Sequence, residues 1–217
     1  MSCCTPAGYR TIFGARAVER DARRYRRKGL TGSAAWLRDA LVAGGVAGRS
    51  VAEIGGGIGA LQVELVEAGA ARAANVEIVE TYEAAARELI AERGVEGRVE
   101  RRVGDVVREP GLAPAADVVV MHRVICCYPD GERLMSEGCA HARERIAITI
   151  PTERRWVRLG VGAVNAWLRL RGIPFRAYVH PFDAIAAAAA EQGFRVSRRS
   201  SGRLWQSSIF ERDRSAA

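Results

Sequence analysis

An acidic residue and four glycines stand together in a spacing that could bind a charged small molecule. The segment reads Glu53-Ile54-Gly55-Gly56-Gly57-Ile58-Gly59. Glycines lack a Cβ, so a ligand can approach the main-chain N–H groups, and the partly positive N-terminus of a following helix would point to the same place. This predicts a nucleotide-like ligand that is negatively charged or carries a carboxylate. Glu53 complicates phosphate binding, because a carboxylate repels phosphate and attracts an ammonium or a hydroxyl.

Two histidines and a tyrosine are the candidates for proton transfer. His122 lies just past a candidate strand, Tyr128 follows it, and His180 lies in a late segment that could close over a bound molecule. An unperturbed imidazole titrates near neutral pH, so either histidine could act as a general base. The alternative role for both is structural hydrogen bonding.

Two pairs of adjacent cysteines could present thiolates to a metal or metalloid, namely Cys3-Cys4 and Cys126-Cys127. Such a site would indicate a soft acceptor. Adjacent cysteines point apart in an extended chain, however, and a reduced cysteine is commonly a small buried apolar residue. The sequence therefore predicts no metal site, and a thiol or metalloid acceptor remains the alternative.

Short apolar runs alternate with helical segments from Ser50 onward, which is typical of βαβ units on a parallel sheet. The predicted strands are 50–54, 74–79, 98–102, 117–121, 145–150, 194–200 and 204–210. Helices are predicted at 15–28, 33–42, 60–68, 82–93, 131–142 and from about 183 to Gln192. Gly202 between the last two strands indicates a hairpin. We expect an α/β, Rossmann-like sheet of seven strands, mostly parallel, with helices on both faces and a C-terminal antiparallel hairpin.

Two segments lie outside this alternation. Residues 1–48 are predicted to form an N-terminal helical cap, and residues 151–182 a possible substrate-covering insertion. Within the insertion, the apolar run from Trp156 to Leu170 is bracketed by arginines and could be a packed helix, an interfacial helix or a cover over an apolar substrate.

Length and composition indicate a single domain spanning residues 1–217. The net charge is +8 and the pI about 9.8, and because Lys28 is the only lysine, nearly all of the positive charge is arginine. No nucleic-acid-binding signature accompanies this charge, so nucleic acid is not the expected partner. The N-terminus lacks a signal-peptide core and no apolar run is long enough to span a bilayer. We expect a cytoplasmic protein with a small-molecule substrate; the sequence does not indicate an oligomeric state.

Two cofactor classes compete for the glycine segment. Gly55-x-Gly57-x-x-Ala60 fits a relaxed dinucleotide fingerprint, which would predict a nicotinamide-dependent oxidoreductase. The segment also resembles motif I of the class I S-adenosyl-L-methionine-dependent methyltransferases. That resemblance continues in order along the chain, with Asn75-Val76-Glu77-Ile78-Val79, Val103-Gly104-Asp105-Val106 and Ala116-Asp117-Val118-Val119-Val120-Met121.

The resemblance implies a cofactor and its contacts. Gly55 and Gly57 would let the backbone approach the methionine and ribose portions, and Glu53 would orient the ammonium. Glu77, with Glu80 as its rival, would accept hydrogen bonds from the ribose hydroxyls. The adenine amino group would be received by Asp105, with Val106 packing nearby. The cofactor-binding set implied in this way is Glu53, Gly55, Gly57, Gly59, Glu77, Asp105, Val106 and Met121.

The second half of the chain resembles the magnesium-protoporphyrin O-methyltransferases. The similar segments are Tyr128-Pro129, Ile150-Pro151-Thr152, Arg176-Ala177-Tyr178-Val179-His180 and Gly193-Phe194-Arg195-Val196-Ser197-Arg198-Arg199. The chain departs from that family at Cys126-Cys127 and has a shorter front, so the resemblance implies shared ancestry rather than a shared substrate. We expect methylation, at oxygen, of a small, partly apolar molecule.

Overall fold

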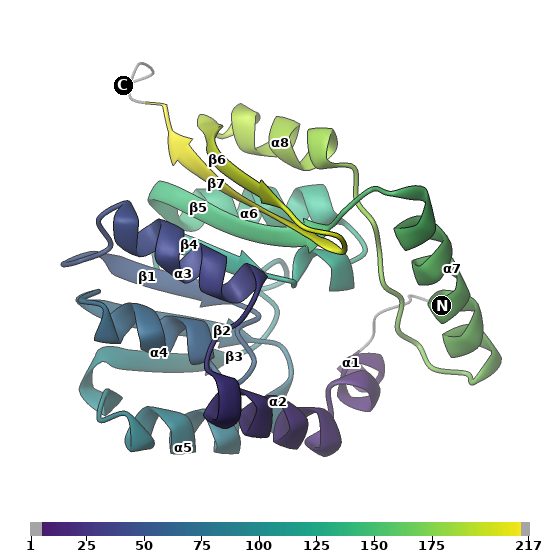
Figure 1. Ribbon diagram of the computed structural model, residues 1–217, viewed down its shortest axis with the longest axis horizontal. Coiled ribbons are helices and arrows are strands. Elements are labelled where there is room, and N and C mark those ends of the chain that lie inside the picture. The colour runs from purple at the N-terminus through teal and green to yellow at the C-terminus, as the bar shows by residue number, and fades with distance from the viewer. Residues whose placement is uncertain (1–5, 214–217) are drawn as a thin grey trace.

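The computed structural model describes residues 6–213 and contains a seven-stranded sheet in the order β3-β2-β1-β4-β5-β7-β6 (Figure 1). The strands are β1 (Ser50–Ile54), β2 (Arg72–Glu77), β3 (Val99–Val103), β4 (Ala116–His122), β5 (Ala142–Pro151), β6 (Phe194–Ser201) and β7 (Trp205–Arg212). The helices are α1 (Pro6–Ile12), α2 (Ala15–Lys28), α3 (Ser33–Ala43), α4 (Ala60–Glu67), α5 (Glu83–Glu92), α6 (Gly131–His141), α7 (Arg155–Leu170) and α8 (Phe182–Glu191).

The first five strands are parallel, and the last two form an antiparallel hairpin. β1 pairs with both β2 and β4, so that Glu53 lies opposite Asn75 on one side and Val120 on the other. β7 runs antiparallel to both β5 and β6. This confirms the predicted fold class. Because β1 to β4 all run the same way, the residues that follow them meet at one edge of the sheet.

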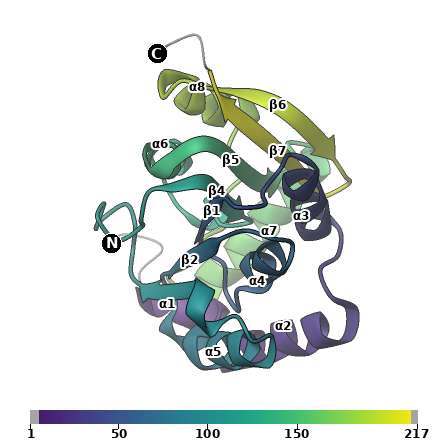
Figure 2. The same cartoon turned by 90° about the vertical axis from the view of Figure 1, so that its left-hand side faces the viewer.

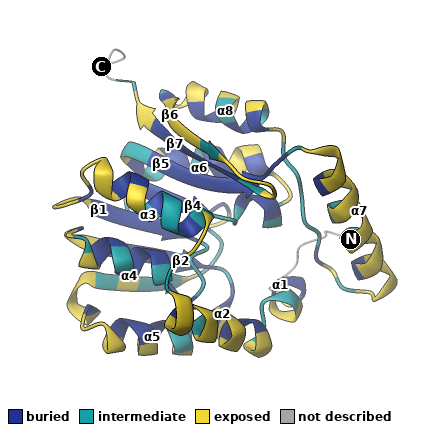
Figure 3. Ribbon diagram, viewed as in Figure 1, coloured by how far each residue is buried: buried dark blue, intermediate teal, exposed yellow. Residues whose placement is uncertain are grey.

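Helices cover both faces of the sheet (Figure 2). On one face α4 packs on β1 and β2, while α3 contacts β5 and β7; on the other, α6 packs on β4 and β5 and contacts α8. The buried strands read as continuous apolar runs because both of their faces are covered (Figure 3). Along β4, Val118 and Val120 face α4, and Val119 and Met121 face α6.

The N-terminal helices are held by segments distant in the chain. From α1 and the turn after it, Tyr9 and Phe13 pack edge-on against Phe175, each with ring centroids 5.6 Å apart. The Tyr9 hydroxyl donates a hydrogen bond to the carbonyl oxygen of Cys127 at 2.7 Å. Residues 6–13 and 173–178 therefore close over the loop that follows β4.

Helix α7 is the peripheral element of the molecule (Figures 1 and 3). Two of its own residues, Val157 and Leu168, are buried. Its other large apolar side chains are exposed, namely Trp156, Leu159, Val164, Trp167 and Leu170. No helix within residues 6–213 is both long enough and apolar enough to cross a membrane.

Most predicted elements match the structure, with differences at their ends. β2 begins at Arg72 and ends at Glu77, two residues earlier at each end than predicted. The helix predicted from residue 82 begins as a 3-10 turn at Glu80–Tyr82 before α5. Helix α1 was not predicted, because a seven-residue helix is marginal on its own and is stabilised here by its contacts with Phe175.

Candidate active site

The glycine segment forms the tight turn between β1 and α4. Gly57 and Gly59 have φ values of 58° and 77°, a left-handed conformation that a side chain disfavours. At Gly56 even a Cβ would lie 2.0 Å from Asn75 Nδ2 and 2.6 Å from Glu53 Oε2. The turn therefore rests directly on two buried polar side chains, which explains why the loop needs glycine there.

Glu53 lies beneath this turn and is 3% exposed. Burial raises its pKa to about 7, although the nearby Arg101 guanidinium opposes the shift. Its Oε2 atom is buried and has no hydrogen-bond partner among the described residues. A buried carboxylate oxygen without a donor is costly, so this atom is suited to receive one from a ligand in the adjoining cavity.

Glu77 ends β2 and shapes the next part of the site. One carboxylate oxygen accepts the Gly57 N–H at 2.8 Å, and the other accepts the Val79 N–H at 2.9 Å. Burial raises the pKa of Glu77, while these two main-chain hydrogen bonds lower it. Glu77 thus ties the glycine turn to β2, and its rival, Glu80, lies on the surface and does not line either cavity described below.

Asp105 follows β3 beside a small cavity of about 40 Å³. Its carboxylate accepts the Val107 N–H at 3.0 Å and the Tyr128 hydroxyl at 3.3 Å. Val106 lines the same cavity. Burial and the Asp105 carboxylate both raise the Tyr128 pKa, so this hydroxyl stays protonated at neutral pH and acts as a donor rather than a base.

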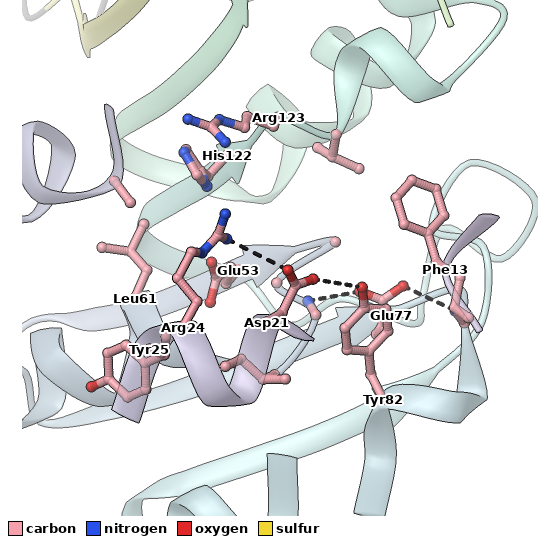
Figure 4. A pocket seen from close by; sticks show the side chains of 18 of the residues that line it. Phe13, Asp21, Arg24, Tyr25, Glu53, Leu61, Glu77, Tyr82, His122 and Arg123 are labelled. Carbon is pink, nitrogen blue, oxygen red and sulfur yellow. Dashed lines mark hydrogen bonds and ion pairs between the residues drawn. The ribbon is translucent and has the colours of Figure 1, made fainter. Parts of the chain in front are cut away.

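A larger cavity of about 410 Å³ lies between the glycine turn, the end of β4 and helices α1 and α2 (Figure 4). It adjoins the small cavity, since Tyr9, Gly55, Val124 and Cys127 line both. Glu53 and Glu77 line its floor. Asp21 lies opposite them on α2, and its carboxylate accepts a hydrogen bond from the Tyr82 hydroxyl at 3.1 Å. Its size suits a nucleotide-sized ligand.

His122 ends β4 and lines the larger cavity. Its Nε2 lies 3.0 Å from the Ser33 hydroxyl at the start of α3. Burial, followed by the positive charges of Arg123 and Arg24, lowers the pKa of His122 to about 3. The imidazole is therefore neutral at pH 7 and is a hydrogen-bonding group and a weak base, not the near-neutral base that the sequence indicated.

His180 and Tyr128 lie away from the larger cavity. His180 Nε2 is 3.0 Å from the Tyr128 carbonyl oxygen, and its ring stacks on Tyr178 and covers Gly131 at the start of α6. Neither of the two cavities is lined by His180. The structure thus separates the three catalytic candidates, with His122 in the larger cavity, Tyr128 at the smaller one and His180 behind Tyr128.

Met121 does not reach either cavity, contrary to expectation. Its side chain is fully buried and would meet a Cβ placed on Gly138 of α6 at 2.8 Å. Side chains alternate along a strand, so Met121 faces α6 while the next residue, His122, faces the cavity. The sequence motif located the strand correctly but gave no indication of which face this residue occupies.

The cysteines do not form a metal site within residues 6–213, where no cluster of three or more potential ligands occurs. Cys126 and Cys127 have sulfur atoms 3.8 Å apart, and both contact the Arg123 carbonyl oxygen. Cys3 and Cys4 lie outside the described residues.

Among the cavity residues that escaped the sequence prediction are two arginines, Arg24 on α2 and Arg123 after β4. Arg24 lies in a run of arginines in the helix predicted at 15–28, and no local pattern distinguishes it from its neighbours. Arg123 follows a candidate histidine, but nothing in its spacing indicates that its side chain is half-buried.

Comparisons with known proteins address both the family and the fold. Residues 52–143 match a family model described as a methyltransferase domain. The comparison with curated proteins finds no match. Among solved structures, magnesium protoporphyrin IX methyltransferase from Synechocystis PCC 6803 with bound SAH has a TM-score of 0.74 at 21% identity, covering 94% of this chain and 98% of that one.

Two further structures share the fold. An O-methyltransferase family protein from Burkholderia thailandensis has a TM-score of 0.70 at 19% identity, over 94% of this chain and 62% of that one. A putative sarcosine dimethylglycine methyltransferase from Galdieria sulphuraria has a TM-score of 0.66 at 14% identity, over 83% of this chain and 85% of that one. At these identities the likeness concerns the fold.

Proposed function

We propose that the chain is a class I S-adenosyl-L-methionine-dependent methyltransferase that methylates a small, partly apolar molecule at oxygen. The observation that carries this proposal is the order of Glu53, Glu77 and Asp105 along one sheet edge, beside a cavity that also has apolar walls. Phe13 from the turn after α1 and Leu30 before α3 supply part of those walls.

The residues of the site fit this cofactor. The buried, unpartnered Oε2 of Glu53 would accept a hydrogen bond from the cofactor ammonium. Gly55, Gly57 and Gly59 allow the close approach, Glu77 would receive the ribose hydroxyls, and Asp105 would receive the adenine amino group with Val106 packing beside it. When bound, the cofactor supplies a methyl group activated on a sulfonium.

The protein's part in the reaction is then to hold the acceptor and exclude water. His122 is the catalytic candidate that the larger cavity retains, as a neutral group that can hydrogen-bond to an acceptor oxygen. Tyr128 would position Asp105 through their hydrogen bond, and His180 would position the Tyr128 loop. A base is needed only if the acceptor oxygen must lose a proton.

We treat residues 1–217 as one methyltransferase domain in the cytoplasm. In this reading, residues 1–48 cap the cofactor, and residues 151–182 cover the acceptor indirectly. The indirect role follows from the contacts, because no residue of α7 lines either cavity, whereas Phe175 supports Tyr9 and Phe13, which do line the larger one.

Calorimetric titration with S-adenosylhomocysteine tests the cofactor assignment. Binding is expected for the wild type and is expected to be lost in Gly57→Arg, whose side chain would enter the cavity. Gly94→Arg is the matched control, because Gly94 has nearly the same φ (62° against 58°) but open space around it. No binding by the wild type, or equal binding by both variants, would refute the assignment. Nicotinamide cofactors are expected to give no fluorescence change on mixing.

A labelled methyl group distinguishes the acceptor classes. Incubation with methyl-labelled cofactor and a panel of hydroxyl-, carboxyl-, thiol- and arsenite-bearing compounds is expected to label oxygen. The second candidate is a thiol or metalloid acceptor, favoured by the two neighbouring sulfur atoms of Cys126 and Cys127. Labelling of arsenite or thiols that is lost in Cys127→Ser would support that candidate instead.

A further inference from the structure

Arg123 is a half-buried cation held at the wall of the larger cavity. It follows β4 directly, and its N–H donates to the Thr149 carbonyl oxygen at 3.1 Å, which fixes the backbone there. Its guanidinium lies 4.4 Å from the centre of the Trp205 ring and donates to the Ser33 hydroxyl at 3.0 Å. The side chain is therefore clamped between β7 and α3 rather than extended into solvent.

The positive charge of Arg123 is not neutralised by a salt bridge within residues 6–213. Its buried Nε has no hydrogen-bond partner there, and its one side-chain hydrogen bond goes to a neutral hydroxyl. Burial and the positive charge of Arg24 lower the pKa of Arg123. A half-buried guanidinium without a carboxylate is unfavourable unless an anion approaches it.

Arg24 brings a second positive charge to the same part of the cavity, from α2 (Figure 4). Its only carboxylate contact among the described residues is with Asp21, at a long 3.6 Å, and Asp21 also lies 3.6 Å from Arg20. The neutral His122 lies near both Arg24 and Arg123 and adds no compensating negative charge. This end of the cavity thus has an excess of positive charge.

The position of Arg123 in the sheet places it on the acceptor side. Glu53 and Glu77 lie at the ends of β1 and β2, and Asp105 follows β3, so the proposed cofactor site extends from β1 toward β3. Arg123 follows β4 and stacks on Trp205 of β7, which lies beyond β5 in the opposite direction. The cation therefore faces the part of the cavity that the cofactor contacts leave open.

We propose that the acceptor of this methyltransferase carries an anionic group, a carboxylate or a phosphate, that binds between Arg123 and Arg24 beside His122. This inference rests on the proposed function and specifies its substrate class as a partly apolar acid. Arg123 can offer its Nε–H and one Nη–H to such a group, which is the geometry that carboxylates and phosphates share. Tyr9 and Phe13 would contact the apolar part.

Calorimetry of the protein saturated with S-adenosylhomocysteine tests this site with three probes that each carry one phenyl ring. Phenylacetate and phenyl phosphate are expected to bind, and the neutral phenylacetamide to bind at least about tenfold more weakly. A preference between the two anions identifies carboxylate or phosphate as the natural group. Equal binding of phenylacetamide, or no binding of either anion, would overturn the proposal.

Substitutions locate the bound anion. Arg123→Gln and Arg24→Gln are each expected to weaken binding of the preferred anion at least about tenfold, and the exposed Arg24 can be replaced without disturbing the fold. Arg23→Gln is the matched control, since it removes the same charge from the same helix at a residue that does not line the cavity. An effect of Arg23→Gln equal to that of Arg24→Gln would overturn the proposal in favour of general attraction.

A second measurement separates this proposal from the cofactor assignment. S-Adenosylhomocysteine carries a carboxylate and 5′-methylthioadenosine does not. If the arginines bind the acceptor, both substitutions leave the affinity ratio of these two nucleotides unchanged. If they bind the cofactor carboxylate, only S-adenosylhomocysteine loses affinity, and the acceptor site is refuted while the cofactor site stands. Failure of both nucleotides to bind the wild type would instead refute the cofactor assignment.

Discussion

Arg123 is the residue at which backbone conformation and charge are both unfavourable. Its φ of 59° is the only positive value at a non-glycine residue within residues 6–213. A Cβ in the left-handed region costs about 1–2 kcal/mol. A conformation with this cost is retained when its side chain is needed where it lies, and here it directs a guanidinium toward the cavity.

Replacing Arg123 by glycine and by alanine separates the strain from the side-chain contacts. Both variants lose the contacts, but only glycine relieves the strain, so Arg123→Gly is expected to be more stable than Arg123→Ala by about 0.5–1 kcal/mol in urea unfolding. Arg87, an exposed residue inside α5, is the control at which alanine is expected to be the more stable variant. The same order at both positions would show that Arg123 is unstrained.

Glu53 makes stability depend on pH. Its folded-state pKa of about 7 exceeds the ordinary value of 4.5, so between these values the folded protein binds more protons than the unfolded chain. The free energy of unfolding should therefore fall as pH rises from 4.5 to 7, by up to about 3 kcal/mol. Glu53→Gln is expected to show a smaller decline, with only the raised pKa of Glu77 still contributing, as measured by chemical denaturation at several pH values. Parallel curves for the two proteins would contradict the assignment.

Cofactor affinity should change with pH in the opposite sense. If an ammonium binds ionised Glu53, binding of S-adenosylhomocysteine displaces a proton below pH 7. The affinity is then expected to be about tenfold higher at pH 8 than at pH 6, with proton release detectable in buffers of different ionisation enthalpy. Glu53→Gln should bind more weakly and show no such dependence. A wild-type affinity that is flat across this range would exclude the ionised form as the partner.

At the scale of single residues, the sequence identified groups whose role depends on local spacing. Glu53 was found because it precedes the glycine segment, and Glu77 because the resemblance implies a carboxylate at the end of the second strand. The structure brings both to one cavity. Arg24 and Arg123 could not be found in this way, since they come to one cavity only after α2 packs against α5 and the turn at Glu80–Tyr82. Met121 was misplaced because a motif locates a strand end without fixing which face a side chain occupies.

At the scale of elements, alternation of apolar runs and helices was enough to predict the sheet. Its strands are buried on both faces, so they appear in the sequence as uninterrupted apolar runs. Element ends were less certain, because the apolar run of β2 continues as far as Val79 while the strand pairing stops at Glu77. Helix α1 depends on tertiary contacts, and no periodicity in seven residues could predict it.

The insertion between β5 and α8 depends on one side chain of α7. Asn165 donates to the Ala177 carbonyl oxygen at 2.8 Å and accepts the Ala177 N–H at 2.9 Å. Asn165→Ala leaves both main-chain groups without this partner and is expected to cost about 1–3 kcal/mol locally. Faster trypsin cleavage between Arg169 and Arg176 would report it. Val164→Ala, at a half-exposed neighbour, is the control, and equal cleavage of the two variants would contradict the prediction.

At the scale of the whole molecule, the cavity exists because distant parts of the chain meet over it. Its floor comes from the turns after β1 and β2, its roof from α1 and α2, and the roof is held by Phe175 and by the loop at Cys127. Sequence motifs described the floor well, because the floor is local. The roof depends on contacts between residues more than a hundred positions apart, which no motif contains.

A bound cofactor analogue should therefore stabilise the roof along with the floor. S-Adenosylhomocysteine at 100 times its Kd is expected to add about 2.7 kcal/mol to the free energy of unfolding, or about 5–10 °C in Tm. Hydrogen exchange should slow in α1, α2 and residues 125–128 and 173–178.

Tyr9→Phe removes the hydrogen bond to Cys127 and should speed exchange of α1 in the free protein. Thr11→Val, which removes only a hydrogen bond within the same helix, should leave residues 125–128 unchanged. If both variants alter residues 125–128 equally, the Tyr9 bond does not hold the roof.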